Sequence, residues 1–273
     1  MEVAKGHLQP LFGIKKGESS MKLGIIADIH GNAPALQAVL QELDARQDVD
    51  HMYCLGDMIA IGPDTNQVLE MLFTRKDVSL VSGNHDEAVL ALAQNNPYPA
   101  SHVHAKRHHQ WVADHIDPAF ISQLQQLPRQ IHQTIHGHTC LFTHYHIEKQ
   151  KVDAPIHEDP FSSIVPAALE KMQALFQDCR ADVIGFGHHH PVHDFRDRDT
   201  VYINPGSLGC QPSSFAPYTI LTIEQEHLSI DRQEAVYDKT SWMASYETYQ
   251  VPERDFLLSA FHGQEKAVLR RGI

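Results

Sequence analysis

Five short segments of the chain carry side chains of the types that bind metal ions in proteins. They supply carboxylates, a carboxamide and imidazoles: Asp28-Ile29-His30, Gly56-Asp57, Gly83-Asn84-His85-Asp86, His144 and Gly187-His188-His189-His190. This mixture of oxygen and nitrogen donors suits borderline divalent ions such as Mn, Fe, Zn or Ni. A single Asp-x-His or Gly-Asp usually marks only a turn. Five such segments in one chain predict a metal site at which catalysis is possible.

A short apolar run precedes each segment, which is typical of a buried β-strand. The runs occupy residues 22–27, 51–55, 78–81, 139–143 and 182–186. In open α/β sheets, ligands collect just beyond the carboxyl ends of the strands. The five segments are therefore expected to converge at one edge of a sheet.

Several connections between these strands show helical periodicity. Residues 33–46 predict an amphipathic helix, because Leu36, Val39 and Leu43 share one face and Pro34 lies in its first turn. Further helices are expected at residues 65–73, 87–93, 102–126 and 161–179, the last one long and interrupted early by Pro166.

Later in the chain the pattern changes to short strands joined by polar turns, at residues 192–196, 200–203, 218–223 and 228–237. These strands predict a second sheet. Two mixed β-sheets packed face to face, with helices outside, form a four-layer αββα sandwich, which is the α/β fold expected here. Residues 21–273 are expected to form a single domain with a helical extension from residue 241. Residues 1–20 are expected to be a disordered leader or to reflect a misassigned start, with Met21 as the true start.

The five segments, in this order, resemble the signature of the calcineurin-like metallophosphoesterase superfamily. The resemblance runs from about residue 22 to about residue 210. The longer motif Asp28-Ile29-His30-Gly31-Asn32, together with Asn204-Pro205-Gly206-Ser207, is similar to the small bacterial phosphodiesterase branch of that superfamily.

The resemblance implies two divalent metal ions, which could be Mn, Fe, Zn, Ni or Mg. It assigns Asp28, His30 and His190 to the first ion, and Asn84, His144 and His188 to the second, with Asp57 bridging both. At the fourth segment the chain reads Thr143-His144-Tyr145-His146, so His146 is the alternative ligand to His144. A shared carboxylate between two dications, with neutral imidazoles around it, limits repulsion among the ligands.

The implied reaction is in-line attack on phosphorus by a hydroxide that bridges the two ions. His85 is expected to donate a proton or a hydrogen bond to the leaving oxygen, and Asp86 is expected to orient His85. The substrate expected from the resemblance is a small, nucleotide-type phosphodiester. A phosphomonoesterase acting on nucleotides, sugars or phosphoproteins is the alternative, followed by an inactive metal-binding scaffold and a metal-sensing module.

Other histidines and turn residues are not assigned to the site. His102, His104, His108 and His109 are expected on the solvated face of a helix, because no Cys or acidic residue completes a zinc-binding spacing. His136-Gly137-His138 predicts a hairpin turn, and His189 is expected to point away from the metals. Asn32 and residues 204–207 are expected to form tight turns rather than to donate hydrogen bonds to phosphate.

The composition is that of a water-soluble enzyme, with 42% hydrophobic residues and no apolar run of membrane-spanning length. A net charge of −12 argues against binding of a nucleic acid polymer. The four cysteines are scattered and are expected to be reduced, which is typical of a cytoplasmic protein. The expected partner is a small-molecule phosphoester, and the pattern leaves the oligomeric state open.

Overall fold

A computed structural model describes residues 19–263 of the chain as two mixed five-stranded sheets flanked by helices. The first sheet has the order β10-β9-β1-β2-β3 and the second the order β4-β5-β6-β8-β7. The strands are β1 (Ser20–Ile26), β2 (His51–Cys54), β3 (Val78–Leu80), β4 (Gln130–Ile135), β5 (His138–Thr143), β6 (Val183–Gly185), β7 (His193–Arg196), β8 (Val201–Asn204), β9 (Phe215–Glu224) and β10 (Leu228–Val236).

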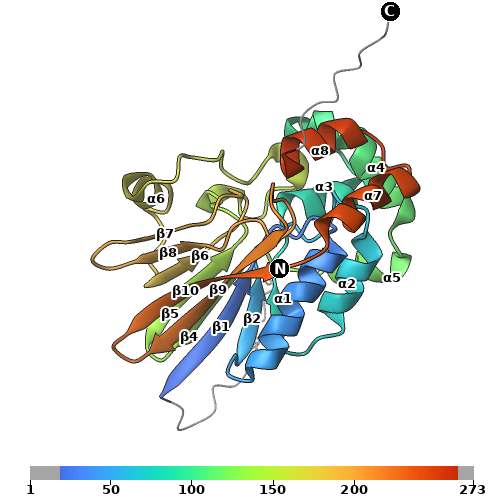
Figure 1. Cartoon of the computed structure of the whole chain (residues 1–273). Coiled ribbons are helices and arrows are strands. Elements are labelled where there is room, and N and C mark those ends of the chain that lie inside the picture. Colours follow the sequence, from blue (N-terminus) through green and yellow to red (C-terminus); the bar gives the residue numbers. More distant parts are fainter. Residues whose placement is uncertain (1–18, 264–273) are drawn as a thin grey trace, which may run out of the picture.

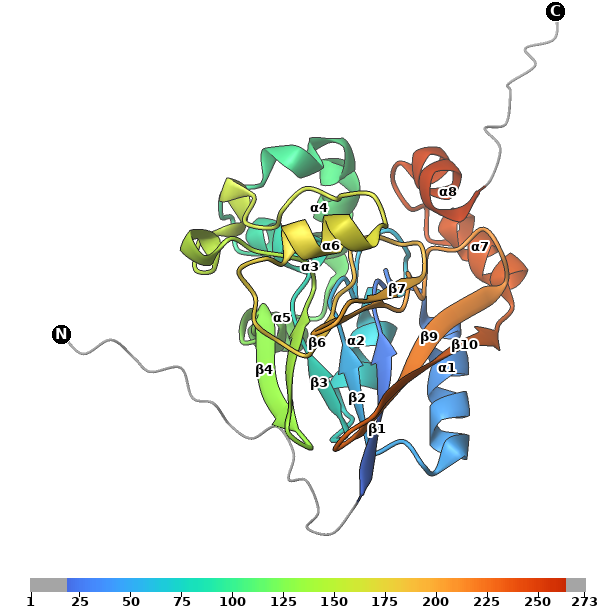
Figure 2. The same cartoon turned by 90° about the vertical axis from the view of Figure 1, so that its left-hand side faces the viewer.

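Helices cover the outer faces of both sheets. Figure 1 shows α1 and α2 beside the first sheet and α6 beyond the second, while α3, α4, α7 and α8 gather at one end of the strands (Figure 2). The predicted four-layer sandwich is confirmed. The helices are α1 (Ala33–Arg46), α2 (Thr65–Phe73), α3 (Asn84–Ala93), α4 (Lys106–His115), α5 (Pro118–Gln125), α6 (Leu169–Leu175), α7 (Lys239–Thr248) and α8 (Arg254–His262), with short 3-10 turns η1 (Ala100–Ala105), η2 (Lys149–Lys151) and η3 (Ile156–Glu158).

Alternate side chains of β1 belong to different cores. Leu23 and Ile25 are fully buried in the core between the two sheets, whereas Ile26 packs in the core beneath α1 and α2. A buried Leu or Ile contributes about 1.5–3 kcal/mol of hydrophobic stabilisation. On the α1 side, a Cβ at Gly24 would lie 3.2 Å from Leu43 Cδ2, so α1 packs closely against this strand. This packing fixes the carboxyl end of β1, where the first metal-binding segment begins.

The predicted long helix at residues 161–179 is wrong, because only Leu169–Leu175 is helical. Pro160 and Pro166 lack a backbone N–H and disfavour a helical conformation in the preceding residue. Phe161, Val165 and Leu169 nevertheless pack on the outer core of the second sheet, so their spacing of four reflects burial rather than a continuous helix.

The late strands do not form a sheet of their own, which corrects the prediction for residues 192–237. β7 and β8 extend the second sheet beside β6, and β9 pairs in antiparallel fashion with β1 of the first sheet. Pairing across such a distance in the sequence is not encoded in the strands' own periodicity.

Two smaller features agree with the sequence. His136 and Gly137, both with positive φ, form the turn of the β4–β5 hairpin as predicted. No helix among residues 19–263 is long and apolar enough to cross a membrane. Residues 1–18 of the predicted leader and residues 264–273 of the predicted extension lie outside the described residues.

Candidate metal centre

The seven predicted metal ligands all follow strands of the two sheets. Asp28 and His30 follow β1, Asp57 follows β2, and Asn84 begins α3 just after β3. In the second sheet, His144 follows β5, and His188 and His190 follow β6. The donor atoms fall into overlapping groups within which they lie no more than 4.8 Å apart: Asp28, His30 and Asp57; Asp57, His144 and His188; and His30, His190 and Cys210.

The first part of the centre is built around the His30 ring. His30 Nε2 lies 3.9 Å from Asp28 Oδ1, 3.8 Å from Asp57 Oδ2 and 3.2 Å from His190 Nε2. His190 Nε2 is also 3.9 Å from Asp28 Oδ1. Four electron-rich atoms therefore point to a common position.

The second part is built around His144, which is fully buried. His144 Nε2 lies 3.2 Å from Asp57 Oδ2, 2.7 Å from Asn84 Oδ1 and 3.2 Å from His188 Nδ1. The other ring nitrogen of His144 is 2.8 Å from the Leu55 carbonyl oxygen, to which it can only donate. This hydrogen bond orients the ring so that Nε2 faces the other candidate ligands, where a metal ion would take the place of its proton.

The alternative ligand, His146, is oriented elsewhere. Its Nδ1 lies 2.8 Å from the Ser162 hydroxyl, and its ring packs edge-on against Phe176. We therefore expect His144→Ala to lower the affinity for at least one metal ion by about 100-fold or more, because it removes a ligand atom outright. The matched change His146→Ala should leave metal affinity within about twofold. Metal content after equilibrium dialysis measures both, and the reverse result would show that the ligand choice is wrong.

Four residues of the centre adopt a left-handed backbone conformation. The φ angles are 53° at Asp28, 49° at His30, 51° at Asp57 and 66° at His188. Such conformations are uncommon for residues other than glycine and cost about 1–3 kcal/mol each when strained. They persist because packed strands and hydrogen bonds hold them, and they turn each side chain toward the centre.

Two glycines allow the loops after β2 and β3 to approach each other. Gly56 has a φ of 88°, and a Cβ there would lie 2.7 Å from the Gly83 nitrogen. A Cβ on Gly83 would in turn overlap the Asp57 carboxylate. The glycine in each of the two segments is therefore required by close backbone contact beside Asp57.

Burial and mutual contact set the charge states in the centre. Burial would raise the pKa of Asp57, but the surrounding imidazoles, His144 first, hold it well below its usual range. Burial opposes protonation of His144, yet Asp57 raises the pKa of that ring to about 9. Burial raises the pKa of Asp28 well above its ordinary value and lowers the pKa of His30 and His188 to about 3.

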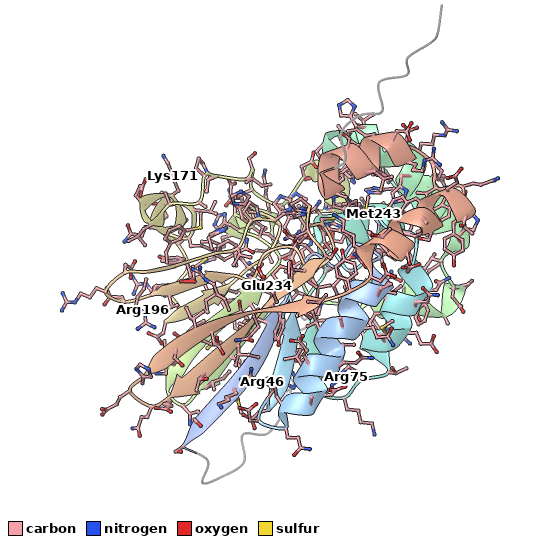
Figure 3. The ribbon with its side chains drawn as sticks, in the orientation of Figure 1. Arg46, Arg75, Lys171, Arg196, Glu234 and Met243 are labelled. Atoms are coloured by element: carbon pink, nitrogen blue, oxygen red, sulfur yellow. The ribbon has the colours of Figure 1, made fainter. Side chains whose placement is uncertain are left out.

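This donor set fits a divalent cation. No lysine or arginine among residues 19–263 forms an ion pair with Asp28 or Asp57. Arg46 and Arg75, labelled in Figure 3, lie toward the opposite end of β1 and β2. Buried carboxylates are costly without a compensating positive charge, which the His144 ring supplies here by holding a proton. A divalent ion would take the place of that proton and compensate both carboxylates.

Asp86 occupies a different position from the one predicted. Its Oδ1 accepts hydrogen bonds from the backbone N–H groups of Met58 and Ile59 at 3.0 and 3.1 Å, and its Oδ2 accepts one from Gly83 at 2.9 Å. It forms no hydrogen bond with His85 in the described chain, so the predicted orienting role is wrong. Asp86 instead caps α3, which starts at Asn84 rather than at residue 87, and ties that helix to the loop of Asp57.

Two of the four histidines assigned to a solvated face, His102 and His109, contact residues of the centre. His109 Nε2 lies 2.8 Å from His85 Nδ1, and His102 Nε2 lies 2.7 Å from Asn84 Nδ2. His108 and His109 are 0% exposed, so the predicted solvated face is wrong for them. The i, i+4 spacing of His104 and His108 gave no indication of which face of this segment packs against α3.

His108 gives a prediction about acid stability. Both of its ring nitrogens are buried without a hydrogen-bond partner, its ring stacks on Trp111, and burial lowers its pKa to about 4. Between about pH 6.5 and pH 4 the unfolded chain therefore takes up a proton that the folded protein does not, so folding stability falls as the pH falls. His108→Phe should remove about 2 kcal/mol of this loss between pH 7.5 and pH 5. Urea unfolding at both pH values tests this, and an equal pH dependence in the two proteins would contradict it.

The turns outside the centre act as supports. Asn32 caps α1 by accepting from the Ala35 N–H at 3.1 Å, and Asn204 Nδ2 donates to the His189 carbonyl at 2.7 Å. Both residues therefore form structural turns, as expected. The His189 ring packs against His193, with centroids 5.1 Å apart, and does not belong to the groups of donor atoms.

Cys210 was not predicted as a neighbour of the centre. Its Sγ lies within 4.8 Å of donor atoms of His30 and His190, and its N–H donates to Ser207 Oγ at 2.8 Å. Ser207 Oγ in turn donates to the Asp28 carbonyl at 2.7 Å. The position of Cys210 just after the 204–207 turn was the available signal, because that turn lies against the first segment.

A cavity of about 490 Å³ opens beside the centre. It is lined by Asn84, His85 and His188 from the centre and by apolar side chains that include Phe161, Phe256 and Phe261. None of the described residues that line it is a lysine or an arginine. The arrangement can hold a cation and place an uncharged or weakly charged organic group beside it.

Known proteins share this sequence pattern and fold. The profile of the Calcineurin-like phosphoesterase superfamily domain matches residues 21–226. An uncharacterized protein of Methanocaldococcus jannaschii is 26% identical over 234 residues, which cover 79% of this chain and 88% of that protein. A symmetrical bis(5'-nucleosyl)-tetraphosphatase of Erwinia tasmaniensis is 37% identical over 73 residues, 26% of this chain and 27% of that protein.

The fold is also similar to that of a solved structure. The structure of a metallophosphoesterase from Sphaerobacter thermophilus covers 88% of this chain with a TM-score of 0.66 at 20% sequence identity, and 97% of that chain is matched. Since the profile spans all five metal-binding segments, the chain belongs to the calcineurin-like phosphoesterase superfamily.

Proposed function

We propose that this protein is a metal-dependent phosphodiesterase that hydrolyses small, nucleotide-type phosphodiesters at a dinuclear centre. The observation that carries the proposal is the position of Asp57, whose carboxylate belongs both to the group with Asp28 and His30 and to the group with His144 and His188. One ion would be held by Asp28, His30, Asp57 and His190, and the other by Asp57, Asn84, His144 and His188. When bound, the two ions would supply Lewis acidity to the phosphoryl group and activate water as the nucleophile.

In this proposal the residues around the centre have separate roles. Asp57, Asp28 and the buried imidazoles exclude water and hold the charge distribution in place. His85 lines the cavity, and its Nδ1 lies 2.8 Å from His109 Nε2. This contact leaves Nε2 as the ring nitrogen that, once protonated, would donate to the oxygen of the leaving group.

The cavity supports a diester rather than a monoester. The phosphate of a monoester carries about −1.5 to −2 charge at pH 7, whereas that of a diester carries a single negative charge. The described lining contains histidines, apolar side chains and one acid, Asp159, and no lysine or arginine to balance an additional charge. The partial match to a bis(5'-nucleosyl)-tetraphosphatase supports a substrate of the nucleotide class.

The direct test is Mn²⁺-dependent hydrolysis of bis(4-nitrophenyl) phosphate and of 4-nitrophenyl phosphate, with the Asp57→Asn protein as the background. We expect kcat/KM to be at least about tenfold higher for the diester, a difference of about 1.4 kcal/mol. A preference for the monoester would make the protein a phosphatase instead. Turnover no higher than that of Asp57→Asn, with any divalent ion, would leave only a metal-binding role.

A further inference from the structure

The first two residues of α3, Asn84 and His85, are each held by a hydrogen-bonded chain that starts in the segment 98–109. Both residues have an orientation that the metal site alone does not determine. The amide of Asn84 can present either its oxygen or its nitrogen to a metal, and a neutral His85 can carry its proton on either ring nitrogen. The contacts of the segment 98–109 decide both questions.

The chain that ends at Asn84 has a fixed direction. The Ser101 hydroxyl donates to the Asp159 carboxylate, which can only accept. Ser101 Oγ is therefore the acceptor for His102 Nδ1–H at 2.6 Å. An amide NH2 group can only donate, so His102 Nε2 accepts from Asn84 Nδ2 at 2.7 Å.

The consequence is a defined orientation of the Asn84 amide. With Nδ2 bound to His102, the carbonyl oxygen of Asn84 faces the centre, 2.7 Å from His144 Nε2. An amide oxygen is a metal ligand, whereas an amide nitrogen is not. His102 thus selects the orientation that can bind a metal ion.

The chain that ends at His85 couples the tautomers of two rings. Tyr98 Oη lies 2.8 Å from His109 Nδ1 and 3.0 Å from the His102 carbonyl oxygen, and His109 Nε2 lies 2.8 Å from His85 Nδ1. A carbonyl oxygen can only accept, so the Tyr98 hydroxyl donates to the His102 carbonyl and accepts from His109 Nδ1–H. The fully buried His109 ring then accepts through its Nε2 from His85 Nδ1–H, which leaves His85 Nε2 as the ring nitrogen that can bind a proton and pass it to another group.

We propose that His102 and His109, with Ser101 and Tyr98 behind them, are positioning residues: His102 sets the ligand orientation of Asn84, and His109 accepts from His85 Nδ1–H and so directs His85 Nε2 to proton transfer. The inference rests on the proposed function, in which His85 donates to the leaving oxygen. The two chains predict separate effects. His102 controls metal affinity without taking part in the donation, and His109 controls the donation without affecting metal affinity.

The first arm of the test measures Mn²⁺ affinity by equilibrium dialysis on the full-length protein. His102→Ala should weaken the binding of one Mn²⁺ ion by about 10- to 100-fold, the usual cost of losing an outer hydrogen-bond partner of a ligand. His102→Gln should recover most of that loss, because its amide oxygen can accept from Asn84 Nδ2. His109→Leu and the exposed control on the same helix, His115→Ala, should bind Mn²⁺ within about twofold of the wild type.

The second arm compares methyl phenyl phosphate, which has the poorer leaving group, with methyl 4-nitrophenyl phosphate in the Mn²⁺-loaded protein. His109→Leu should lower kcat by about 100-fold for the phenyl diester and by less than about tenfold for the nitrophenyl diester, since a general acid matters most for a basic leaving oxygen. Tyr98→Phe, which keeps the aromatic ring, should lower kcat for the phenyl diester by about tenfold. His115→Ala should change neither rate.

The possible outcomes distinguish a failure of the positioning roles of His102 and His109 from a failure of the proposed function. If His85→Ala shows no greater loss on the phenyl diester, the donating role of His85 fails, whatever the other variants do. If His85→Ala discriminates between the diesters but neither His109→Leu nor Tyr98→Phe does, the coupling to His109 is overturned. Wild-type Mn²⁺ affinity in His102→Ala overturns the first chain. Equal losses of affinity and rate in both histidine variants, with a lowered melting temperature, would show that the segment only packs against α3.

Discussion

Asp57→Asn should abolish nearly all phosphodiester hydrolysis, with a loss of kcat of at least about 10³-fold, and should weaken the binding of both metal ions. The carboxylate of Asp57 belongs to two of the three groups of candidate ligand atoms, one for each proposed ion, so the effect of its loss should reach both ions. Several kcal/mol of transition-state stabilisation come from metal ions in such centres, and each 1.4 kcal/mol is a factor of ten in rate. In the wild type, Asp57 Oδ1 accepts a hydrogen bond from the backbone N–H of His85 at 2.8 Å. Asparagine keeps the shape of the side chain and an oxygen that can accept the same hydrogen bond.

The matched control for this change is Asp64→Asn. Asp64 is also a buried carboxylate, but its Oδ2 accepts from Trp242 Nε1 at 2.8 Å and from the Ala33 N–H at 3.3 Å, outside the metal-binding groups. It should keep two bound ions and most of its activity. Metal analysis after dialysis, together with initial rates, distinguishes the two proteins. Retention of either ion at wild-type affinity in Asp57→Asn would contradict a bridging role.

His85→Ala should retain its metal ions but lose about 10²- to 10⁴-fold in kcat, which is the usual contribution of a positioned general acid. The ring of His85 does not belong to the groups of metal-binding atoms, and its Nδ1 is occupied by His109. The loss should be larger for diesters with poor leaving groups, because their leaving oxygen most needs a proton or a hydrogen bond.

His189→Ala is the control for this second prediction. His189 is also a half-buried histidine near the centre, but its ring packs against His193. Its removal should change kcat by no more than about twofold. Steady-state rates on methyl phenyl phosphate test both variants, with metal content measured on the same samples. Full activity of His85→Ala on this substrate would exclude it as the proton donor.

The parts of the structure that the sequence predicted well are those with strong local signals. Helix α1 has the predicted bounds because its apolar residues share one face, Pro34 starts it and Asn32 caps it. The five segments converge as predicted because each follows a strand, and the carboxyl ends of β1 and β2 are brought together by parallel pairing. Such signals depend only on neighbouring residues. The prediction of one sheet edge is wrong, because three segments follow strands of the first sheet and two follow strands of the second.

The parts that the sequence did not predict depend on contacts between distant residues. Phe161 and Val165 have helical spacing but pack as an extended segment on the second sheet. The assignment of β9 to β1 rather than to β8 depends on the topology of the whole chain. His102, in η1, and His109, in α4, were placed in solvent because nothing in the local spacing of histidines indicates that α4 packs on α3. The left-handed φ angles of Asp28 and Asp57 are set by the same tertiary contacts.

The most direct test of a dinuclear phosphodiesterase is stepwise reconstitution of the metal-free protein with Mn²⁺, with bound ions and bis(4-nitrophenyl) phosphate hydrolysis measured on the same samples. A shared Asp57 predicts that hydrolysis stays low at about one ion per chain and rises to its maximum as the occupancy approaches two. Full hydrolysis with one ion per chain, or none with two ions bound, would contradict the proposed centre.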